Sequence, residues 1–233
     1  MLESLKLRNV GPAPELELEL SERLNFLAGD NGLGKTFLLD VAWWALTRTW
    51  ARNLVVPHLP PATPSIGYQY QTLAAHSHRY ASTFDRQTEK WSVKRGRPPI
   101  PGIVIYAQVD GGFSVWDPAR NYWKREDPER PPSYLFSAED VWFGNDLCEG
   151  LIRDWASWQR EDGAAFAQLE SVLTHLSPSH LEPLVPGELR KVSLDDPKRY
   201  PTLKMPYGED VALIHASAGM RRIVALAYLL VWT

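Results

Sequence analysis

The feature that most constrains this chain is the stretch "GDNGLGKT" at residues 29–36. Gly29, Gly34, Lys35 and Thr36 match the pattern G-x-x-x-x-G-K-[ST], the Walker A motif or P-loop. Glycines at these positions let the backbone turn tightly, so that successive N–H groups point at one anion. A helix that begins near Gly34 adds the positive end of its dipole. In such a loop Lys35 reaches the β- and γ-phosphates of a nucleotide, and the Thr36 hydroxyl ligates Mg²⁺.

The residues around the loop have the order that this motif needs. "RLNFLAG" at residues 23–29 is typical of a short buried strand, and "FLLDVAWWALTRTW" at residues 37–50 is typical of a helix. Leu38, Val41 and Ala45 make that helix apolar nearly all round, so we expect it to be buried. The alternative is that the sequence matches the Walker A pattern by chance. A chance match that also has a strand before it and a helix after it is rarer than a match to the pattern alone. The sequence therefore predicts a nucleotide-binding loop.

The composition is that of an ordinary soluble globular protein. The 233 residues are 44% hydrophobic and 23% charged, and the net charge is −3. No global basic field attracts nucleic acid, so any contact with it has to come from a local patch. Cys148 is the one cysteine, which excludes an intramolecular disulfide, and we expect it to be buried. No signal peptide is evident, and the apolar run Ile223–Trp232 is too short for a bilayer, so we expect a cytoplasmic protein without a membrane contact.

The rest of the chain alternates between strand and helix signals. "SLKLRNV" and residues 15–21 read as strands, and residues 66–118 as an antiparallel β lobe with a hairpin turn at Asp110-Gly111. Residues 137–176 have helical spacing with a break near Asp162-Gly163, and "PTLKMPYGEDVALIHAS" returns to short strands. Trp155 and Trp158 could stack on nucleobases, but their spacing favours core packing.

A second motif, "SAGMRR" at residues 217–222, opens the last predicted helix. Ser217 is a good N-cap, and Gly219 and the pair Arg221–Arg222 follow it. A small-residue helix start followed by arginines suits an anion. The alternative is an ordinary capped helix with two solvated arginines.

Together, "LKLRNVGP", "LNFLAGDNGLGKT" and "HASAGMRRIVALAYLLVW" resemble the ATPase heads of the SMC/RecF/OLD branch of the ABC class. More closely, the chain resembles bacterial AAA-type ATPases of phage-defence loci, which "VWDPARNYW", "GLIRDWASWQ" and "LSPSHLEPLVPG" also resemble. The resemblance implies a homodimer in which two heads enclose two ATP molecules. In it, Ser217 and Gly219 of one head contact the ATP of the other. The implied cradle for ATP and Mg²⁺ within one head is Gly29, Asp30, Asn31, Gly32, Leu33, Gly34, Lys35 and Thr36.

The family also has a Q-loop glutamine that contacts the metal. Gln108 and Gln159 are the candidates in this sequence, and we expect Gln108 to contact the metal. In the family the signature helix leads to a Walker B strand with an Asp for Mg²⁺ and a Glu for the attacking water. The sequence given ends at Thr233, before any such strand. "IVIYAQVD" ends in Asp110 but reads as a hairpin, and "VSLDD" at residues 192–196 lacks the apolar run. We therefore expect nucleotide binding to exceed hydrolysis.

The predicted fold is α/β: an ABC-ATPase-like P-loop core with an antiparallel β lobe and a helical subdomain, lacking the Walker B half. We expect one incomplete domain over residues 1–233, with segments 1–52, 66–118, 137–176 and 200–233. The leading hypothesis is an ATP-driven dimerising switch in DNA metabolism or phage defence, governing an effector protein. The alternative is a nucleotide-sensing interaction module without hydrolysis. A P-loop kinase or GTPase is disfavoured, because no N-K-x-D motif occurs and "SAGMRR" has no place in those folds.

Overall fold

The first two strands follow the alternation in the sequence. The computed structural model describes residues 1–71, 76–93, 102–121, 133–180 and 182–233. Strands β1 (Leu2–Arg8) and β2 (Glu15–Glu19) pair antiparallel, with Leu5 opposite Leu18 and Leu7 opposite Leu16. Leu5 and Leu7 are buried, whereas Lys6 between them faces the other side of the sheet.

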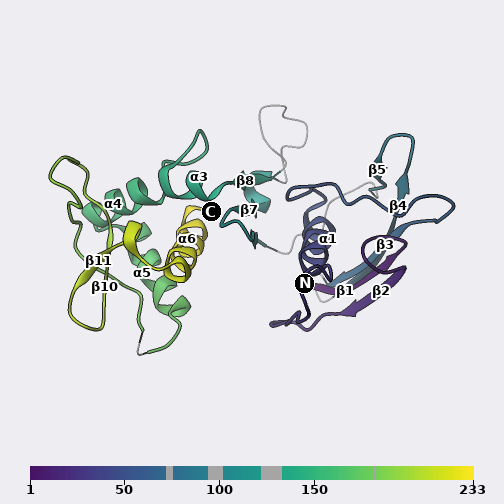
Figure 1. Ribbon diagram of the computed structural model, residues 1–233, viewed down its shortest axis with the longest axis horizontal. Coiled ribbons are helices and arrows are strands. Elements are labelled where there is room, and N and C mark those ends of the chain that lie inside the picture. Colours follow the sequence, from purple (N-terminus) through teal and green to yellow (C-terminus); the bar gives the residue numbers. More distant parts are fainter. Residues whose placement is uncertain (72–75, 94–101, 122–132, 181) are drawn as a thin grey trace. The chain divides into compact units, whose positions relative to one another are not determined.

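The predicted β lobe continues this hairpin in one sheet. Strands β3 (Ser65–Gln71), β4 (Ser77–Asp85) and β5 (Lys90–Trp91) complete the order β2-β1-β3-β4-β5, and every neighbouring pair is antiparallel. Helix α1 (Lys35–Thr47) lies on one face of this sheet (Figure 1). Its buried Val41 and Trp44 belong to the same core as Ile66 and Tyr68 of β3. The buried helix is confirmed, and so is an antiparallel sheet over residues 65–91. Residues 104–116 of the predicted lobe instead belong to a separate three-stranded sheet.

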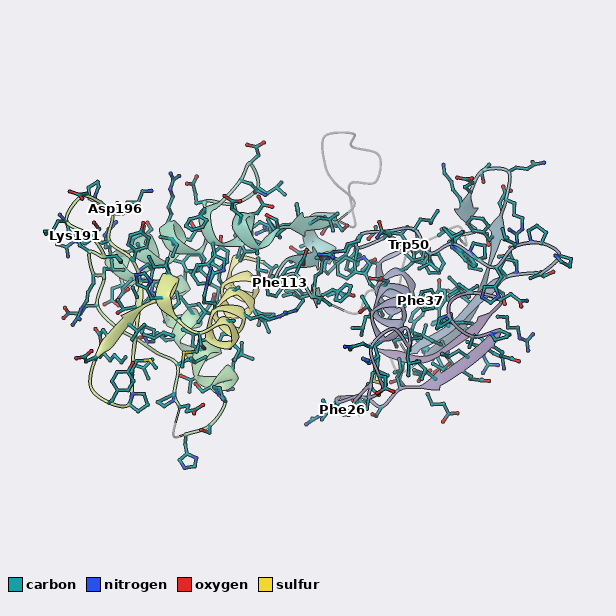
Figure 2. All side chains as sticks on the ribbon, in the orientation of Figure 1. Phe26, Phe37, Trp50, Phe113, Lys191 and Asp196 are labelled. Atoms are coloured by element: carbon teal, nitrogen blue, oxygen red, sulfur yellow. The ribbon has the colours of Figure 1, made fainter. Side chains whose placement is uncertain are left out.

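The strand predicted at residues 23–29 is wrong. The structure assigns no strand there, and Leu24 and Phe26 are 80% and 88% exposed. Figure 2 shows Phe26 on a segment that projects from the sheet of its unit. An extended segment becomes a strand only when a neighbour takes up its N–H and C=O groups. Among the described residues no strand pairs with this segment, so its apolar residues stay exposed.

The chain forms two compact units, each with a core of its own. Unit 1 comprises Met1–Tyr106 and Ser114–Tyr134, and unit 2 comprises Ala107–Phe113 and Leu135–Thr233. The chain passes from one unit to the other within the short strands β6 (Val104–Ala107), β7 (Phe113–Trp116) and β8 (Tyr134–Phe136). Helix α2 (Pro118–Asn121) belongs to unit 1, where Trp43 and Trp116 form a second buried group.

Unit 2 is mainly helical. Its helices are α3 (Ala138–Phe143), α4 (Leu151–Glu161), α5 (Ala164–Leu176) and α6 (Ala218–Trp232). The predicted break at residues 162–163 is confirmed, because Asp162 adopts the left-handed conformation that ends α4 and Gly163 starts α5. A small antiparallel sheet has the order β11-β10-β9, from β9 (Val185–Pro186), β10 (Thr202–Lys204) and β11 (Asp210–Ala212). The short 3₁₀ helix η2 (Leu213–His215) follows it. The chain is thus mixed α/β with antiparallel sheets.

The tryptophans of α4 pack inside unit 2, as their spacing predicts. Trp155 is fully buried and donates to Gln159 Oε1 at 3.1 Å, and Trp158 stacks on Tyr228 with ring centroids 5.7 Å apart. The Trp155 ring is therefore not available for base stacking, and Tyr228 covers one face of the half-buried Trp158 ring. Cys148 is buried, as expected. Of the helices in the described ranges, none is both long and apolar enough to span a membrane.

Candidate functional site

The loop at residues 29–36 contains three glycines with positive φ. The angles are 148° at Gly29, 85° at Gly32 and 87° at Gly34, a range that favours glycine because a Cβ atom makes it strained. Gly34 is the N-cap of α1, and no side chain caps this helix start. The N–H groups of the first turn of α1 therefore have no side-chain acceptor and remain able to bind an anion, as do those of α4 and α5; what α1 adds is the preceding loop of positive-φ glycines.

Lys35 lies across this loop. Its Nζ atom donates to the carbonyl oxygens of Gly29 at 2.6 Å and of Asp30 at 2.7 Å. Among the described residues the ammonium group has no carboxylate partner, so it is held over the loop by these carbonyls alone. Thr36 is exposed, and in the described part of the chain its hydroxyl makes no hydrogen bond. The Lys35 ammonium keeps a donor, and the Thr36 hydroxyl its oxygen, that these hydrogen bonds do not use.

Residues of the turn between β1 and β2 pack against the loop at residues 29–36 and against α1. A Cβ atom at Gly34 would lie 2.7 Å from Pro12 Cγ, and one at Gly11 would meet the ring of Phe37 in α1. Glycine at position 34 is thus required twice, by its φ and by Pro12. In the sequence, "GPAP" indicates only a turn between strands. The contact depends on where that turn meets α1, and no local pattern in the sequence reports this.

The second motif opens α6 in unit 2. Ser217 is the N-cap, and its Oγ accepts from the N–H of Met220 at 3.3 Å. Gly219 is exposed, and a Cβ atom there would meet nothing within 4 Å. The two arginines are not simply solvated. Arg221 lies 4.6 Å from the centroid of the Trp142 ring, and Arg222 donates to the carbonyl oxygen of Gln108.

Gln108 and Gln159 occupy different settings within unit 2. Gln108 begins a turn in which its N–H donates to Gly112 O at 2.8 Å and its carbonyl accepts from Gly111 N at 3.2 Å. Asp110 Oδ1 accepts from Gly112 N at 3.1 Å, so the turn predicted here is confirmed. The amide of Gln159 is used at both ends, because it accepts from Trp155 and donates to Gly187 O at 2.8 Å. Gln159 is therefore a packing residue, and Gln108 is the remaining candidate.

The sequence-predicted residues divide between the two units. Gly29–Thr36 belongs to unit 1, and Gln108, Ser217 and Gly219 belong to unit 2. The structure brings Gln108 and the start of α6 together through Arg222. The loop at residues 29–36 is described within unit 1 by itself.

One acidic side chain of α1 has an altered pKa. Burial raises the pKa of Asp40 above its usual range, and the hydroxyl of Tyr106 bonds to it. Burial, and then the nearby Asp40 charge, raises the pKa of Tyr106 to about 12. Asp40 is thus half-buried in unit 1 beside Tyr106. In the described ranges no group of three or more His, Cys, Asp or Glu side chains could hold a metal ion.

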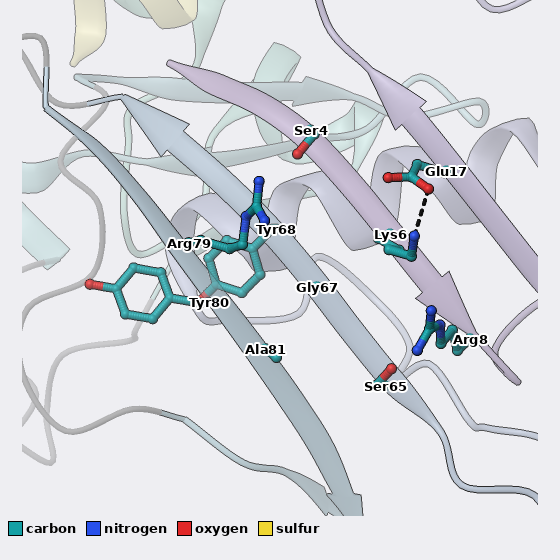
Figure 3. Close-up of a pocket in the computed structure, with 10 residues that line it drawn as sticks. All are labelled: Ser4, Lys6, Arg8, Glu17, Ser65, Gly67, Tyr68, Arg79, Tyr80 and Ala81. Carbon is teal, nitrogen blue, oxygen red and sulfur yellow. Dashed lines mark hydrogen bonds and ion pairs between the residues drawn. The ribbon is translucent and has the colours of Figure 1, made fainter.

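A cavity of about 490 Å³ lies on the sheet of unit 1 and does not involve the loop (Figure 3). The register places Lys6 opposite Gly67, and Gly67 opposite Ala81, so small residues leave a trough along β3. The cations beside it already have partners. Lys6 Nζ lies 2.7 Å from Glu17 Oε2, and Arg79 donates to Gln69 Oε1. This is the solvated face common in antiparallel sheets.

Comparisons with known proteins identify no family. No family model matches the sequence, and no curated protein matches it. Among solved structures, the chain is similar to the SMC head domain from Thermotoga maritima, with 12% identity and a TM-score of 0.44. The match covers 99% of this chain and 72% of that one. A likeness of this degree carries no functional argument.

Proposed function

We propose that Gly29–Thr36 is a Walker A loop that binds the phosphates of ATP together with Mg²⁺. One observation supports this above all others: three positive-φ glycines lead into a helix start that no side chain caps. Such a start concentrates free N–H groups and the positive end of the helix dipole at one point. The backbone N–H groups of Asp30, Asn31 and Leu33 complete the proposed cradle.

The side chains at the loop fit this ligand. Lys35 donates to two carbonyl oxygens, and phosphate oxygens accept more strongly because they are charged. Lys35 therefore exchanges weak acceptors for strong ones when phosphate enters. The Thr36 hydroxyl is the proposed ligand of Mg²⁺, which supplies charge neutralisation at the phosphates when bound. Gln108 is the second proposed contact of the metal.

We propose further that the chain is the head of an ABC- or SMC-like ATPase that dimerises around ATP. Ser217 and Gly219 are exposed at the start of α6, so a second copy can approach them. A two-fold axis forms the same contact twice, from Ser217 and Gly219 of each copy to the γ-phosphate bound by the other. The proposed role as a switch for an effector in DNA metabolism or phage defence rests on the resemblance of the motif-bearing segments.

The alternative function, a nucleotide sensor without hydrolysis, is favoured by the state of two candidate carboxylates. Asp110 accepts from the N–H of Gly112, and Asp196 accepts from Lys198 N at 2.9 Å and Tyr200 OH at 2.7 Å. Both groups stabilise their own turns. Neither is therefore poised to hold Mg²⁺ or to orient an attacking water.

Two measurements on the chain test these proposals. Calorimetric titration with Mg·ATP is expected to show one saturable site per chain, and absence of binding would overturn the nucleotide function. Phosphate release is expected to be negligible. Robust Mg²⁺-dependent release that Lys35→Ala abolishes would instead show that the chain carries a working carboxylate, with Asp110 the first to be replaced.

Light scattering with a slowly hydrolysed ATP analogue tests the dimer. The analogue is expected to raise the mass of the native chain, and Gly219→Arg is expected to prevent this. The open space at Gly219 allows the arginine to fit in the monomer, so its affinity for nucleotide should change less than twofold. A dimer that is indifferent to Gly219→Arg would contradict the proposed contact.

A further inference from the structure

A second cavity, of about 520 Å³, lies in unit 2 between α4 and the loop that precedes β10. Helix α4 forms one wall, with Ile152 and Ala156 as its apolar part, and Pro197 stands on the other. The volume is within the range of small-molecule sites. The cavity is lined by four cationic side chains: Arg153, Arg160, Lys198 and Arg199.

The loop on the second wall is held in shape. Arg190 and Tyr200 close it by exchanging two backbone hydrogen bonds of 3.0 and 2.8 Å. Within the loop, the Asp196 carboxylate accepts from the N–H of Lys198 at 2.9 Å and from the hydroxyl of Tyr200 at 2.7 Å. These bonds, the one from Lys198 N–H first, lower the pKa of Asp196. Figure 2 labels Asp196 and Lys191 on this loop. The loop presents Lys198 and Arg199 from a fixed turn.

The two acidic side chains of the cavity are already engaged. Glu149 lies 3.1 Å from Arg153, so this pair offsets itself. Asp154 accepts from the hydroxyl of Tyr228 in α6 at 2.7 Å, and burial raises the pKa of Asp154. In the described part of the chain, neither carboxylate forms an ion pair with Arg160, Lys198 or Arg199.

Arg160, Lys198 and Arg199 are left without an ion pair within 4 Å in the part of the chain that the structure describes. The charges of Asp196 and Lys198 interact, but both carboxylate oxygens of Asp196 accept hydrogen bonds from within the loop. Three like charges on one cavity repel each other, and a bound polyanion offsets that repulsion. Residues nearly forty positions apart contribute these charges, so no single charged run along the chain accounts for them.

We propose that this cavity binds a small anion that carries two or more phosphate groups. Arginine and lysine are the side chains that bind phosphate in proteins, and arginine does so with paired donors. Among the described residues that line the cavity none is aromatic, so they offer no surface on which a nucleobase stacks. The ligand is thus recognised by its phosphates. No residue of the loop at residues 29–36, which belongs to the other unit, lines this cavity.

Calorimetry with inorganic tripolyphosphate tests the site, in Lys35→Ala protein so that the proposed ATP loop does not contribute. We expect one saturable site per chain at about 0.15 M salt, where loosely held ions are screened. Adding Arg160→Ala and Arg199→Ala should lower the affinity at least tenfold. Lys191→Ala is the matched control, because Lys191 is an exposed cation of the same loop outside the cavity, and it should change the affinity less than twofold.

The exposed positions of Arg160 and Arg199 predict unchanged thermal unfolding of these variants, and Lys198→Ala alone is the substitute if the double variant melts early. Lack of saturable binding would overturn the proposal, and so would an equal loss in Lys191→Ala, which would indicate diffuse charge. A short single-stranded oligonucleotide that binds through the same arginines more tightly than tripolyphosphate would overturn the assignment to a small molecule. Loss of ATP binding elsewhere in the chain leaves this result unaffected.

Discussion

Two helices of this chain begin at motifs that suit anions, yet the two starts are built differently. At α1 the N-cap is Gly34, with a left-handed φ of 87° and no capping side chain. At α6 the N-cap is Ser217, with φ −58° and an Oγ atom that accepts from Met220 N. A serine satisfies one of the free N–H groups itself, whereas a glycine leaves them all to a ligand.

Of the starts of α1, α3 and α6, that of α3 has the most backbone N–H groups bonded to side chains. Ser137 and Asp140 form a capping box in which each side chain accepts from the backbone N–H of the other, at 3.1 and 2.7 Å. The box satisfies two of the N–H groups at this start, so fewer remain for a ligand. From α1 through α6 to α3, side chains thus satisfy more of the N–H groups at the helix start, and we base the proposed division of roles on this order. The α1 start holds nucleotide within one chain, and the α6 start only completes a site on a second copy.

The largest expected effect is a loss of ATP affinity at the start of α1. Lys35→Ala removes the charge that Gly29 and Asp30 hold over the loop. A hydrogen bond from a charged group contributes about 1.5–3 kcal/mol, so ATP affinity should fall roughly tenfold to a hundredfold for each such bond to phosphate that the variant cannot make. Lys90→Ala, at an exposed lysine of β5, is the matched control and should leave the affinity unchanged. Calorimetry measures both. Equal affinities in the native chain and Lys35→Ala would remove the loop from the account.

The next prediction compares Gly34 with Gly32, to separate the effect of a positive φ from that of the close contact with Pro12. Gly34→Ala combines a strained φ of +87° with a contact of 2.7 Å to Pro12, whereas Gly32→Ala has a φ of +85° and nothing within 4 Å. The strain alone costs about 1–3 kcal/mol, and Gly34→Ala should reduce both the ATP affinity and the free energy of unfolding more than Gly32→Ala does. Urea unfolding and calorimetry measure the pair. Identical reductions would show that the β1–β2 turn does not support the loop.

The contact between Pro12 and Gly34 also shows what a local sequence pattern does not contain. Local patterns predicted β1, the break at residues 162–163, the turn at Asp110 and helix α6, because each is set by neighbours in the chain. The strand predicted at residues 23–29 failed because pairing needs a partner strand, which no local pattern reports. The bond from Arg222 to Gln108 spans 114 positions in sequence and had no local signal either.

A smaller effect compares the capped starts. Ser137→Ala and Ser217→Ala should each lower the free energy of unfolding by about 0.5–2 kcal/mol, with Ser137→Ala the larger. Each substitution removes one bond to a serine Oγ, of 3.1 Å at Ser137 and 3.3 Å at Ser217, and the shorter bond is part of a capping box. Both lie in unit 2, so one denaturant transition reports them. A larger decrease in Ser217→Ala would contradict the view that its start is only partly closed.

The smallest effect is the pH dependence of the capping box. Bonds from Ser137, the side-chain bond first, lower the pKa of Asp140 below its usual range. The pKa is lower folded than unfolded, so this stabilisation is present above the unfolded value of about 3.9 and is lost as pH falls through the folded value. Asp140→Asn should therefore be less stable than the native chain at pH 7, with the difference shrinking in acid. Urea unfolding at pH 7 and in acid measures the free energies of unfolding of both proteins. A difference between them that does not change with pH would contradict this role of Asp140.

Amide chemical shifts in the presence of Mg·ADP test the central claim most directly, because they report each helix start separately. ADP lacks the γ-phosphate through which a second copy is proposed to contact Ser217 and Gly219. The account predicts that the amide signals of Gly32, Gly34, Lys35 and Thr36 shift with saturation, while those of Ala218, Gly219 and Met220 stay in place. Shifts at the start of α6 without shifts at the start of α1, or no shift at either, would contradict it.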